Sequence, residues 1–474
     1  MEADAAPLVI DLDGTLVRTD LLHESVLKMV RNAPYLLLAL PYWLLAGKAS
    51  FKRRVAERAC PDFDSLPYDP ELVDWIREQR DNGRRVVLCT ASDSAYAEGV
   101  ATHLGLFDEV IGSDGTTNLS AERKAAMLVD RYGDHGFDYA GNSNADLEVW
   151  RDSRRAILVS ASPSLGQAAR ERFDVEREFG RKVPRISSWL RAMRLHQWLK
   201  NLLVFVPLAG AHQLHNLALL WQATIAFLAF GLCASSVYIL NDLMDVEADR
   251  HHPRKRFRPF ASGALSTAKG IAFAALLLVA AISLAVTVTP GFVFWLGVYF
   301  ALTLAYTFDL KRRPLADCVA LGGLHTLRIV AGWSAVGLSA SFWLLAFSLF
   351  LFLSLAFVKR YSELAAIVRS GAAEAQGRGY RASDLQLVLT MGVAAGFNAV
   401  LLMALYINGD TVLKLYQRPE ILWLAIPVVL YWISRMWMKA HRGDMDDDPL
   451  LYAIRDRYSL ACAVLCGCIA WAAS

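Results

Sequence analysis

The chain has 474 residues, of which 55% are hydrophobic and 20% are charged, and its mean hydropathy is +0.31. A formal net charge of +3 is too small to indicate a nucleic-acid-binding protein, and the seven cysteines form no ligand-spaced cluster with histidines that would indicate a zinc site. Charged residues are frequent in the first 180 residues, and apolar runs dominate afterwards. We therefore predict a soluble domain over residues 1–182 and a membrane domain over residues 183–474.

The first strand-like run, residues 8–10, follows the start of the chain almost at once, without the basic and apolar segments of a secretory leader. We therefore expect no cleavable signal and a first domain that stays in the cytoplasm. Strands are predicted at residues 7–10, 85–89 and 137–140, with an amphipathic helix around Lys124. This alternation predicts an α/β domain with a doubly wound parallel sheet, whose active site lies at the carboxyl ends of the strands.

Polar side chains gather at those predicted strand ends. Asp11 and Asp13 follow the first strand, and their spacing of two residues turns both carboxylates to the same side. Thr90 follows the second strand, and a glycine turn with Asn142 and Asp146 follows the third. These side chains are the candidates for the chemistry of the first domain.

A helical insert, about residues 20–80, is predicted between the first two strands, in the position of a cap over the active site. Its run at residues 35–46 is apolar and aromatic, but it is too short and too interrupted by proline to span a membrane. Basic residues follow this run: Lys48, Lys52, Arg53 and Arg54. The run therefore either lies in the membrane interface or packs within the cap or on the second domain.

The second domain is predicted to be all-α, with nine transmembrane helices. We place them at residues 190–210, 217–240, 267–287, 291–307, 317–337, 341–358, 385–407, 421–438 and 457–473. Basic residues crowd one set of connections, whereas the opposite set has only Lys414 and Arg418. The positive-inside rule therefore predicts a multi-pass protein of the inner, cytoplasmic membrane, with the first domain in the cytoplasm.

The second predicted span ends in an acidic motif. At 100° per residue, Asp242, Asp245 and Asp249 fall within about 60° of one another around a helix, with Asn241 beside them. Carboxylates this close repel one another unless a hard cation neutralises them, which predicts Mg²⁺ shared with a diphosphate. Four cations in the stretch 251–259 follow directly and are predicted to bind phosphate: Arg254, Lys255, Arg256 and Arg258. The alternative is a hydrated helix end beside a basic loop.

In their order, the residues at the strand ends of the first domain resemble the haloacid dehalogenase-like hydrolases, over nearly the whole domain. The resemblance implies that Asp11 is the nucleophile that forms an aspartyl-phosphate. It also implies that Asp13 protonates the leaving oxygen and then activates water. Thr90 and Lys124 would hold the phosphoryl oxygens.

The same resemblance places Asp146 with Asp11 on Mg²⁺, with Asn142 beside them. Many members of the family have aspartate where this chain has Asn142. We expect the missing charge to weaken Mg²⁺ binding without removing the nucleophile. The domain is therefore predicted to be a phosphatase, and the alternative is an inactive, structural domain.

The acidic motif after the second of nine spans, with residues 306–312 before Asp317, resembles the UbiA superfamily of membrane prenyltransferases. Residues 197–205, 359–364 and 442–449 look like the branch typified by the decaprenyl-phosphate phosphoribosyltransferases, which transfers phosphoribose from phosphoribosyl pyrophosphate to a polyprenyl phosphate. The resemblance implies Mg²⁺ on the motif residues Asn241, Asp242, Asp245 and Asp249. It also implies a set of substrate-binding residues: Lys200, Asn201, Lys255, Arg256, Arg258, Tyr306, Lys311, Asp317, Arg328, Lys359 and Arg360.

Several of these residues admit a structural role as well. Arg328, inside the fifth predicted span, is either a phosphate ligand or the partner of an acidic residue. Lys200, Lys359 and Arg360 lie at predicted cytoplasmic helix ends, where they either bind substrate or anchor the helices. The aspartates at residues 446–448 either close over a metal or cap the ninth helix.

These interpretations predict an enzyme that makes polyprenylphosphoryl 5-phosphoribose and then removes the 5-phosphate. Phosphoribosyl pyrophosphate and an allylic diphosphate both lose a Mg²⁺-bound diphosphate from a carbon that supports positive charge, so the same ligands serve either. One alternative is therefore an aromatic prenyltransferase of quinone or haem type with an independent hydrolase. Another is a non-catalytic scaffold that senses phosphorylated metabolites. The predicted partners are polyprenyl phosphate, phosphoribosyl pyrophosphate and the bilayer, and a homo-oligomer is compatible with the sequence.

Overall fold

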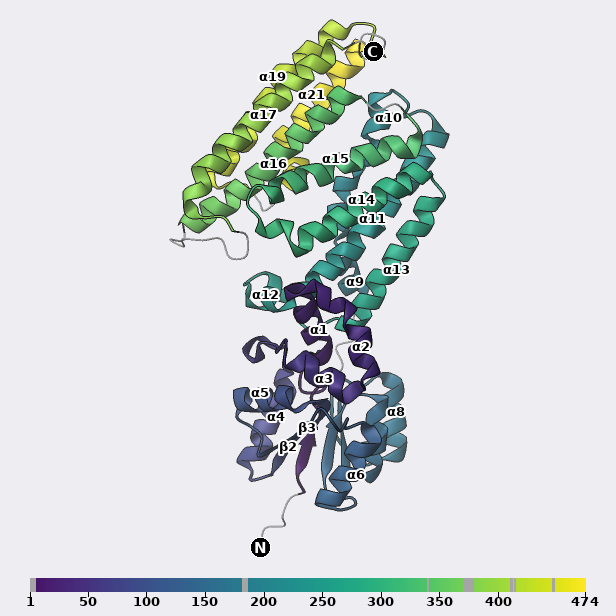
Figure 1. Ribbon diagram of the computed structural model, residues 1–474, viewed down its shortest axis with the longest axis vertical. Helices are drawn as coiled ribbons and strands as arrows, with labels where there is room; N and C mark the ends of the chain where they lie inside the picture. Colours follow the sequence, from purple (N-terminus) through teal and green to yellow (C-terminus); the bar gives the residue numbers. More distant parts are fainter. Residues whose placement is uncertain are drawn as a thin grey trace. The chain divides into compact units, whose positions relative to one another are not determined.

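The computed structural model describes residues 6–180, 186–338, 341–369, 379–409, 412, 415–445 and 448–474 (Figure 1). The chain forms two compact units, and neither is continuous in sequence. The first joins Met1–Met193 with Tyr238–Ala274, and the second joins Arg194–Val237 with Ala275–Ser474. The first unit therefore contains the acidic motif as well as the predicted soluble domain.

A six-stranded parallel sheet forms the centre of the first unit, in the order β3-β2-β1-β4-β5-β6. Its strands are β1 Leu8–Ile10, β2 Val86–Asp93, β3 Glu109–Ser113, β4 Asp138–Gly141, β5 Arg155–Val159 and β6 Val175–Phe179. The chain lays β2 and β3 on one side of β1 and the remaining strands on the other. This reversal puts the topological switch point between β1 and β4 and confirms the predicted doubly wound sheet.

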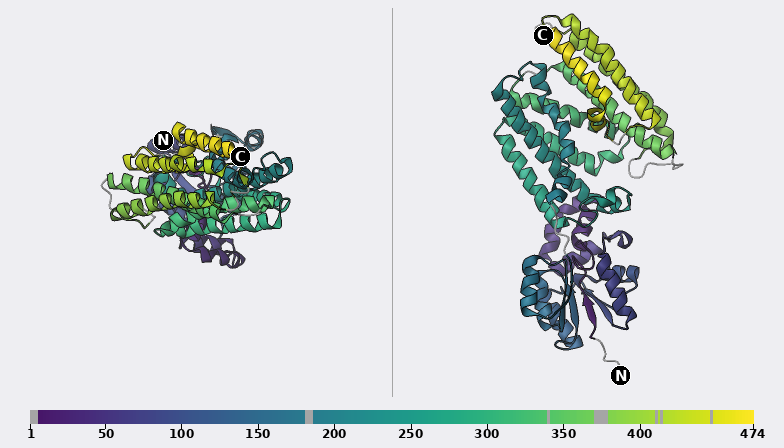
Figure 2. Two further views of the ribbon diagram at one scale, coloured as in Figure 1. Left: turned by 90° about the horizontal axis from the view of Figure 1, so that it is seen from above. Right: turned by 180° about the vertical axis from the view of Figure 1, so that it is seen from behind.

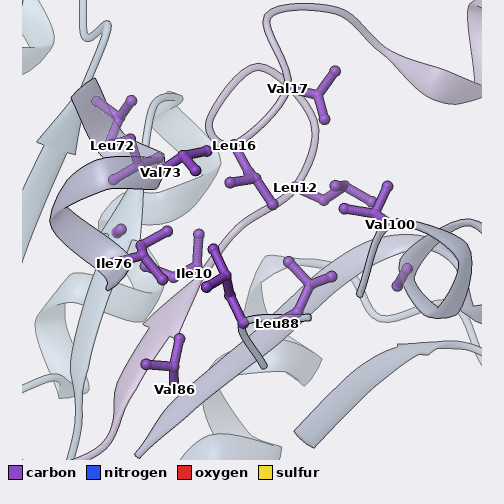
Figure 3. Packing of buried hydrophobic residues seen from close by; sticks show 14 of the residues in the cluster. Ile10, Leu12, Leu16, Val17, Leu72, Val73, Ile76, Val86, Leu88 and Val100 are labelled. Carbon is purple, nitrogen blue, oxygen red and sulfur yellow. The ribbon is translucent and has the colours of Figure 1, made fainter. Parts of the chain in front are cut away.

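Helices cover both faces of the sheet because successive strand residues point to opposite sides. Leu8 and Ile10 pack under α4 Pro70–Asp81 and α5 Ser94–Leu104, where Ile10 lies beside Ile76 and Leu88 (Figure 3). Val9 points the other way, into a cluster with residues of α6 Ala121–Tyr132, α7 Leu147–Asp152 and α8 Pro163–Arg172. The sheet is therefore buried on both faces, and only its strand ends are available for a site.

The insert between β1 and β2 is helical, as predicted. It consists of α1 Leu21–Asn32, η1 Pro34–Leu38, α2 Leu40–Leu45, α3 Lys48–Ala56, η2 Phe63–Ser65 and α4. In its apolar run, Trp43 is buried and the guanidinium of Arg58 lies 4.7 Å from the centre of its ring. Four other large side chains of the run are exposed by 71–87%: Tyr35, Leu38, Tyr42 and Leu45. Packing within the cap accounts for Trp43 and in part for Leu36, Ala39 and Leu40, but not for the four exposed side chains. The position of the run in a membrane interface therefore stays a prediction.

Helix α1 is anchored to the segment around the acidic motif by ion pairs. Arg250 donates to both carboxylate oxygens of Glu24 at 2.6 and 2.8 Å, and both side chains are buried. Lys28 pairs with Glu247 at 2.7 Å. Breaking a buried pair leaves an uncompensated charge, so the Arg250 pair fixes where α1 packs.

Seven helices of 19 to 28 residues in the described part of the chain are long and apolar enough to cross a membrane. They are Leu217–Met244 (α11), Thr267–Val286 (α13), Pro290–Phe308 (α14), Ala316–Val336 (α15), Phe342–Arg369 (α16), Ala382–Ile407 (η7 and α17) and Pro419–Arg442 (η8 and α19). The protein is therefore a multi-pass membrane protein with seven candidate spans.

The two other predicted spans differ from the expectation of long helices. Residues 190–210 divide into the end of α9 Ile186–Met193, the 3₁₀ helix η4 Leu195–Phe205 and the short α10 Val206–Gly210. Arg194 adopts the left-handed conformation, with φ of 52°, and this turn ends α9. The last predicted span is α21 Arg457–Ala473, which has 17 residues. Lys414 of the topology prediction lies outside the described residues.

Consecutive helices from α14 to α17 pack side by side, and α19 contacts both α17 and α21 (Figures 1 and 2). Small residues permit the closest approaches. Helix α15 also packs on η4, and a Cβ placed on Gly332 would lie 2.3 Å from the carbonyl oxygen of Val204. Gly323 of the same helix has no neighbouring atom within 4 Å of such a Cβ. The backbone of η4 can therefore approach α15 only because residue 332 is glycine.

We predict that Gly332→Ala lowers the stability of the purified protein by about 1–3 kcal/mol, because the added methyl group must displace the η4 backbone. Gly323→Ala is the matched control and should keep the wild-type melting temperature, since alanine there meets open space and favours helix. Thermal unfolding in detergent micelles measures both. An equal loss of stability in the two variants would show that replacing glycine by alanine destabilises the helix at either position. The contact with Val204 would then not be the cause.

Candidate functional sites

The first candidate site lies at the switch point of the sheet, where Asp11 follows β1. The carboxylate of Asp11 is buried, accepts a hydrogen bond from the ammonium of Lys124 at 2.7 Å and another from the hydroxyl of Thr15 at 3.2 Å. Burial raises the pKa of Asp11, and the charge of Lys124 opposes that rise. The structure therefore places the predicted nucleophile against the predicted phosphoryl-binding lysine.

Asp13 lies in the same loop and is held by two donors. The backbone N–H of Leu21 donates to its carboxylate at 2.8 Å, and the hydroxyl of Ser92 donates at 2.6 Å. Burial, together with the charge of Asp20, raises the pKa of Asp13 to about 7. A carboxyl group with this pKa can give up and take back a proton near neutral pH, as the predicted acid–base role requires.

Thr90 and Ser92 line this site from β2. The hydroxyl of Thr90 lies 3.5 Å from the carboxylate of Asp13 and accepts from the backbone N–H of Ser92 at 3.0 Å. Ser92 was not predicted from the sequence. Strand alternation could have found it, because a residue two positions after Thr90 faces the same side of the sheet.

Asp146 has a different set of contacts from those predicted. One of its oxygens accepts from the backbone N–H groups of Asn142 and Ser143 and from the hydroxyl of Ser143, at 2.9–3.0 Å. Its other oxygen accepts from the hydroxyl of Tyr139 at 3.0 Å. Both oxygens are therefore engaged in holding the loop that carries Asn142, and the position of Asp146 on Mg²⁺ stays a prediction.

Tyr139 of β4 links the two halves of this site and was not predicted. Its hydroxyl accepts from the ammonium of Lys124 at 2.8 Å while it donates to Asp146. A continuous chain of hydrogen bonds thus runs from Asp11 through Lys124 and Tyr139 to Asp146. Its position inside a buried strand gave no sign of this role, because strand tyrosines commonly serve packing.

Asn142 lies over the loop that carries both aspartates. Gly14 in that loop has φ of 79°, and a Cβ added to it would lie 2.1 Å from the amide nitrogen of Asn142. Glycine is therefore required at position 14 both for the backbone conformation and for the close approach. The carboxylate of Asp11 and the amide oxygen of Asn142 are hard oxygen donors, so this corner fits Mg²⁺ with one charge fewer than an aspartate would provide.

All of these residues except Thr15, Leu21 and Tyr139 border a cavity of about 760 Å³. The insert contributes Asp20, Leu22 and Lys52 to its wall. Further wall residues come from beyond the sheet domain: Trp189, Ser262, Gly263, Ala264, Leu265, Ser266 and Lys269. All of them belong to the first compact unit, so the cavity is completed within that unit.

The second candidate site is the acidic motif at the end of α11. Asp242 and Asp249 are buried, and both accept from the same guanidinium nitrogen of Arg258, at 3.2 and 2.6 Å. Asp245 lies between α11 and α12 Val246–His251 and pairs with Arg31 of α1 at 3.4 Å. The predicted acidic face is therefore present for two of its three carboxylates, and the break at Asp245 turns the third toward α1.

Arg258 lies where a divalent cation would neutralise the pair. Burial raises the pKa of Asp249, and the positive charge of Arg258 opposes that rise. Two buried carboxylates that converge on one positive centre fit a hard divalent cation. Among the described residues, no three histidine, cysteine or acidic side chains are grouped to hold a metal alone. Oxygens of a bound diphosphate would complete the coordination.

The remaining predicted cations near this motif are more exposed. Lys255 and Arg256 lie on the surface, and the guanidinium of Arg256 stacks over the ring of Phe257 at 4.9 Å. Tyr306 of α14 and Lys311 of η6 Leu310–Arg312 are partly buried. Their predicted substrate contacts stay predictions.

In the second unit, Arg328 of α15 is buried among neutral partners. It donates to the amide oxygen of Asn201 at 2.8 Å, to the hydroxyl of Tyr299 at 2.9 Å and to the carbonyl oxygen of Leu324 at 2.6 Å. The amide nitrogen of Asn201 is buried without a hydrogen-bond partner among the described residues. None of the three acceptors is acidic, so these contacts favour an anion-binding role for Arg328 over an acidic structural partner.

Unlike Arg328, Arg360 has acidic partners, one of which is Asp317. Arg360 and Asp317 form a buried ion pair with each other, and Arg360 also pairs with Glu363. The hydroxyl of Tyr380 donates to Asp317 at 2.7 Å. These contacts favour the anchoring alternative for Arg360, because both charges are already compensated within the unit.

Lys200 pairs with Asp448, whose side chain also accepts from the backbone N–H of Leu450 at 3.2 Å. Asp448 therefore caps a helix, as the structural alternative predicted, but the helix is α20 Pro449–Arg455 rather than the last one. Lys359 is partly buried. Residues 446 and 447 lie outside the described residues, so the proposed closure of these aspartates over a metal stays a prediction.

The fold and the two acidic sites define a class: a multi-pass membrane protein with an α/β domain of the phosphohydrolase type. The chain belongs to the UbiA prenyltransferase family, whose model matches residues 202–460, more than half of its length. Residues 8–151 match the model of the haloacid dehalogenase-like hydrolases. Both resemblances inferred from the motifs are therefore confirmed.

Three relatives are informative. Uncharacterized protein y4nM of Sinorhizobium fredii is 38% identical over 456 residues, which are 96% of this chain and 88% of that protein. Nodulation protein NoeC of Azorhizobium caulinodans is 38% identical over 60% of this chain and 92% of its own length. Decaprenyl-phosphate phosphoribosyltransferase of Mycolicibacterium smegmatis is 33% identical over 57% of this chain and 87% of its own. The alignment with y4nM is long enough to include both parts of the chain.

We predict that Tyr139→Phe lowers phosphatase kcat/KM on p-nitrophenyl phosphate by about tenfold or more, because Lys124 and Asp146 each lose a hydrogen bond. Tyr132→Phe is the matched control. Its hydroxyl donates to Glu109, and the residue does not line the cavity, so its activity should equal that of the wild type. Equal activity of Tyr139→Phe and wild type would show that the hydrogen-bond chain does not support the reaction.

Proposed function

We propose that this protein transfers 5-phosphoribose from phosphoribosyl pyrophosphate to a polyprenyl phosphate such as decaprenyl phosphate, and that its hydrolase domain removes the 5-phosphate. The observation that carries the proposal is the joining, in one chain, of a hydrolase cavity with a membrane domain similar to a decaprenyl-phosphate phosphoribosyltransferase. The product of phosphoribosyl transfer carries a phosphomonoester, which is the bond that such a hydrolase cleaves. A prenylated aromatic product carries none.

In the transfer step, the bond between the ribose C1 and the diphosphate oxygen breaks, and an oxygen of the polyprenyl phosphate forms the new bond to C1. Asp242 and Asp249, with Asn241 and Asp245 beside them, would hold Mg²⁺, which supplies the positive charge that the departing diphosphate requires. The acceptor phosphate is already anionic, so no general base is needed. The leaving group is inorganic diphosphate, and charge is conserved without a co-reactant.

Positive side chains must neutralise the substrate phosphates at the edge of a bilayer, where an unpaired charge is costly. Arg258 is held by Asp242 and Asp249, and its guanidinium could turn to the diphosphate once a divalent cation neutralises them. In the second unit, Arg328 and the unsatisfied amide of Asn201 are candidates to bind a phosphate. The first feature supports the proposal because a bound cation would release Arg258 from Asp242 and Asp249. The second supports it because no described residue accepts a hydrogen bond from the amide nitrogen of Asn201.

In the hydrolytic step, a carboxylate oxygen of Asp11 attacks the 5-phosphate, and the bond between phosphorus and the ribose C5 oxygen breaks. Asp13 gives its proton to the departing oxygen and then takes one from the water that opens the aspartyl-phosphate. The products are inorganic phosphate and a free 5-hydroxyl. Asp11 and Asn142 would hold Mg²⁺, which shields the charge of the phosphoryl group during both steps.

The proposed setting is the inner, cytoplasmic membrane, with the hydrolase domain in the cytoplasm. Its partners are polyprenyl phosphate, phosphoribosyl pyrophosphate and the bilayer, without nucleic acid. Nine crossings would require the segment over residues 190–210 and α21 to enter the membrane beside the seven long helices. Neither proposed reaction depends on the number of copies of the protein in the assembly. A homo-oligomer is therefore compatible with both reactions.

We expect membranes that contain the protein to convert labelled phosphoribosyl pyrophosphate and decaprenyl phosphate into a labelled lipid. Asp242→Asn should lower this rate by roughly a hundredfold or more, about 3 kcal/mol, because it removes a charge from the metal-binding pair. Glu247→Gln is the control, since this neighbouring carboxylate pairs with Lys28 instead. Full activity of Asp242→Asn at saturating Mg²⁺ would identify the motif as a hydrated helix end.

The same assay separates the leading proposal from the aromatic alternative. No labelled lipid in the wild type, together with transfer from a prenyl diphosphate to an aromatic acceptor, would replace phosphoribosyl transfer with aromatic prenylation. The family match is compatible with either substrate pair, so the product decides between them.

Asp11→Asn should leave lipid formation intact and stop it at the 5-phosphate, because a carboxamide cannot form the acyl-phosphate. The product of the variant should be heavier than the wild-type product by one phosphate in mass spectrometry. Asp134→Asn removes an exposed carboxylate of the same domain and should give the wild-type product. A phosphate retained by wild type and variant alike would show that the hydrolase acts on another substrate or is inactive.

A further inference from the structure

Part of the wall of the hydrolase cavity comes from outside the hydrolase match. The match ends at residue 151, whereas Trp189, Lys269 and the segment Ser262–Ser266 also line the cavity. Lys269 and Ser262–Ser266 lie inside the match to the UbiA prenyltransferase family. A segment of the transferase family thus borders the site at which Asp11 would attack a phosphate.

This wall is held against the sheet domain by specific contacts within the first unit. Gly263 has φ of +69°, and a Cβ added to it would lie 2.8 Å from the Cβ of Arg18. The hydroxyls of Thr19 and Thr267 lie 3.3 Å apart, and both residues are buried. Within the segment, the hydroxyl of Ser262 donates to the carbonyl oxygen of Arg258 at 2.9 Å. The segment is therefore a built part of the cavity.

Most cations of the cavity are already committed to protein acceptors. Lys124 donates to Asp11, Arg18 donates to Asp69 at 3.1 Å, and Lys52 donates to the carbonyl oxygen of Ala91. Lys269 is exposed, and in the described part of the chain its ammonium has no hydrogen bond or ion pair. It is thus a cation that faces the cavity and remains free for a ligand.

Lys269 also lies at the end of a candidate membrane span, where the boundary with lipid head groups is expected. It is the third residue of α13, a candidate membrane span, so its ammonium lies at one end of that helix. Trp189, which lines the same cavity, packs edge-on against Phe273 of α13 at 4.8 Å between ring centres. Indole rings favour this boundary because one part is apolar and the N–H is polar.

The cavity is also large for a phosphate alone. Its volume of about 760 Å³ lies in the range of cavities that bury most of a ligand of several rings or groups. A substrate that places its phosphomonoester at Asp11 would extend along the wall of Ser262–Ser266 toward Lys269. A second negative group on that substrate would meet the free ammonium there.

We propose that the hydrolase site selects a membrane-anchored phosphomonoester that carries a second, phosphodiester group, and that Lys269 is the residue that recognises the phosphodiester. This rests on the proposed function, whose lipid product has both groups, and it extends that function to a residue of the transferase match. Lys269 does not touch the reacting atoms. It is a specificity-determining residue that acts on binding of the substrate.

The test uses the full-length protein in nanodiscs and two matched probes. One is a short-chain prenylphosphoryl ribose 5-phosphate, and the other is the prenyl riboside 5-phosphate, which lacks the phosphodiester. The wild type should prefer the first. Lys269→Met should raise KM for the first probe by about tenfold or more, with little change in kcat, and should leave the second probe unaffected. Lys269→Arg keeps the charge and should restore the preference.

Two controls keep a folding defect apart from a loss of recognition. Arg77→Met removes an exposed cation of α4, which pairs with Asp74 and does not line the cavity, so it should keep the wild-type preference. Hydrolysis of p-nitrophenyl phosphate should be equal in wild type and Lys269→Met. A wild type without preference for the phosphodiester probe, or a Lys269→Met variant that keeps it, would overturn the proposal.

A second pair of probes separates this proposal from the proposed function. Phosphatidylglycerol phosphate carries a phosphomonoester beyond a phosphodiester, and phosphatidic acid carries only the phosphomonoester. If the wild type cleaves neither ribosyl probe but prefers phosphatidylglycerol phosphate through Lys269, the role of Lys269 stands and ribosyl specificity is wrong. If the wild type and all variants cleave the ribosyl probes equally, the proposed function stands and Lys269 has no part in recognition. Cleavage of soluble phosphomonoesters alone would overturn the membrane-anchored substrate.

Discussion

A carboxylate that is removed from water needs a counter-charge, and both acidic sites of this protein are built around that need. At the hydrolase site the ammonium of Lys124 lies against Asp11, and at the acidic motif the guanidinium of Arg258 lies against Asp242 and Asp249. Each cation comes from a different element than the carboxylates it neutralises. The position of α6 relative to β1, and of the loop before α13 relative to α11, therefore follows from charge as well as from packing. A phosphate with its own cation would change this balance, because the resident side chain could then contact the phosphate.

The first compact unit crosses the boundary that hydropathy suggests. Composition changes near residue 182, but the unit also includes Tyr238–Ala274, which carries the acidic motif and the wall of the hydrolase cavity. The buried pair of Glu24 and Arg250 holds α1 to this segment. The helical insert between β1 and β2 therefore contacts the segment around the acidic motif as well as the sheet domain. This arrangement gives a physical reason for joining the two proposed activities in one chain, since the segment that follows the motif borders the hydrolase cavity.

Much of the hydrolase site was predictable because its signals are local. A strand followed at once by Asp11 and Asp13 shows which way both carboxylates point. Thr90 was predicted to follow the next strand, but it lies within that strand, which continues to Asp93. Tyr139 was not predictable, since its role depends on the ammonium of Lys124 and the carboxylate of Asp146 meeting at one hydroxyl. Sequence spacing does not encode such a meeting of three elements.

At the acidic motif the limits are of the same kind. Helical periodicity correctly grouped Asp242 with Asp249, but it could not show that the helix breaks at Asp245 or that Arg258 returns to the pair. Likewise, apolar length identified seven long helices, whereas residues 190–210, which also carry Arg191, Arg194 and Lys200, divide into short helices at a left-handed turn. The sequence by itself determined the class of each domain, the periodic faces and the residue types at the sites, because these depend on neighbours within a few positions. Only the tertiary structure decided which charges neutralise one another and which segment completes the cavity, because those contacts join residues that are far apart in the chain and follow from packing.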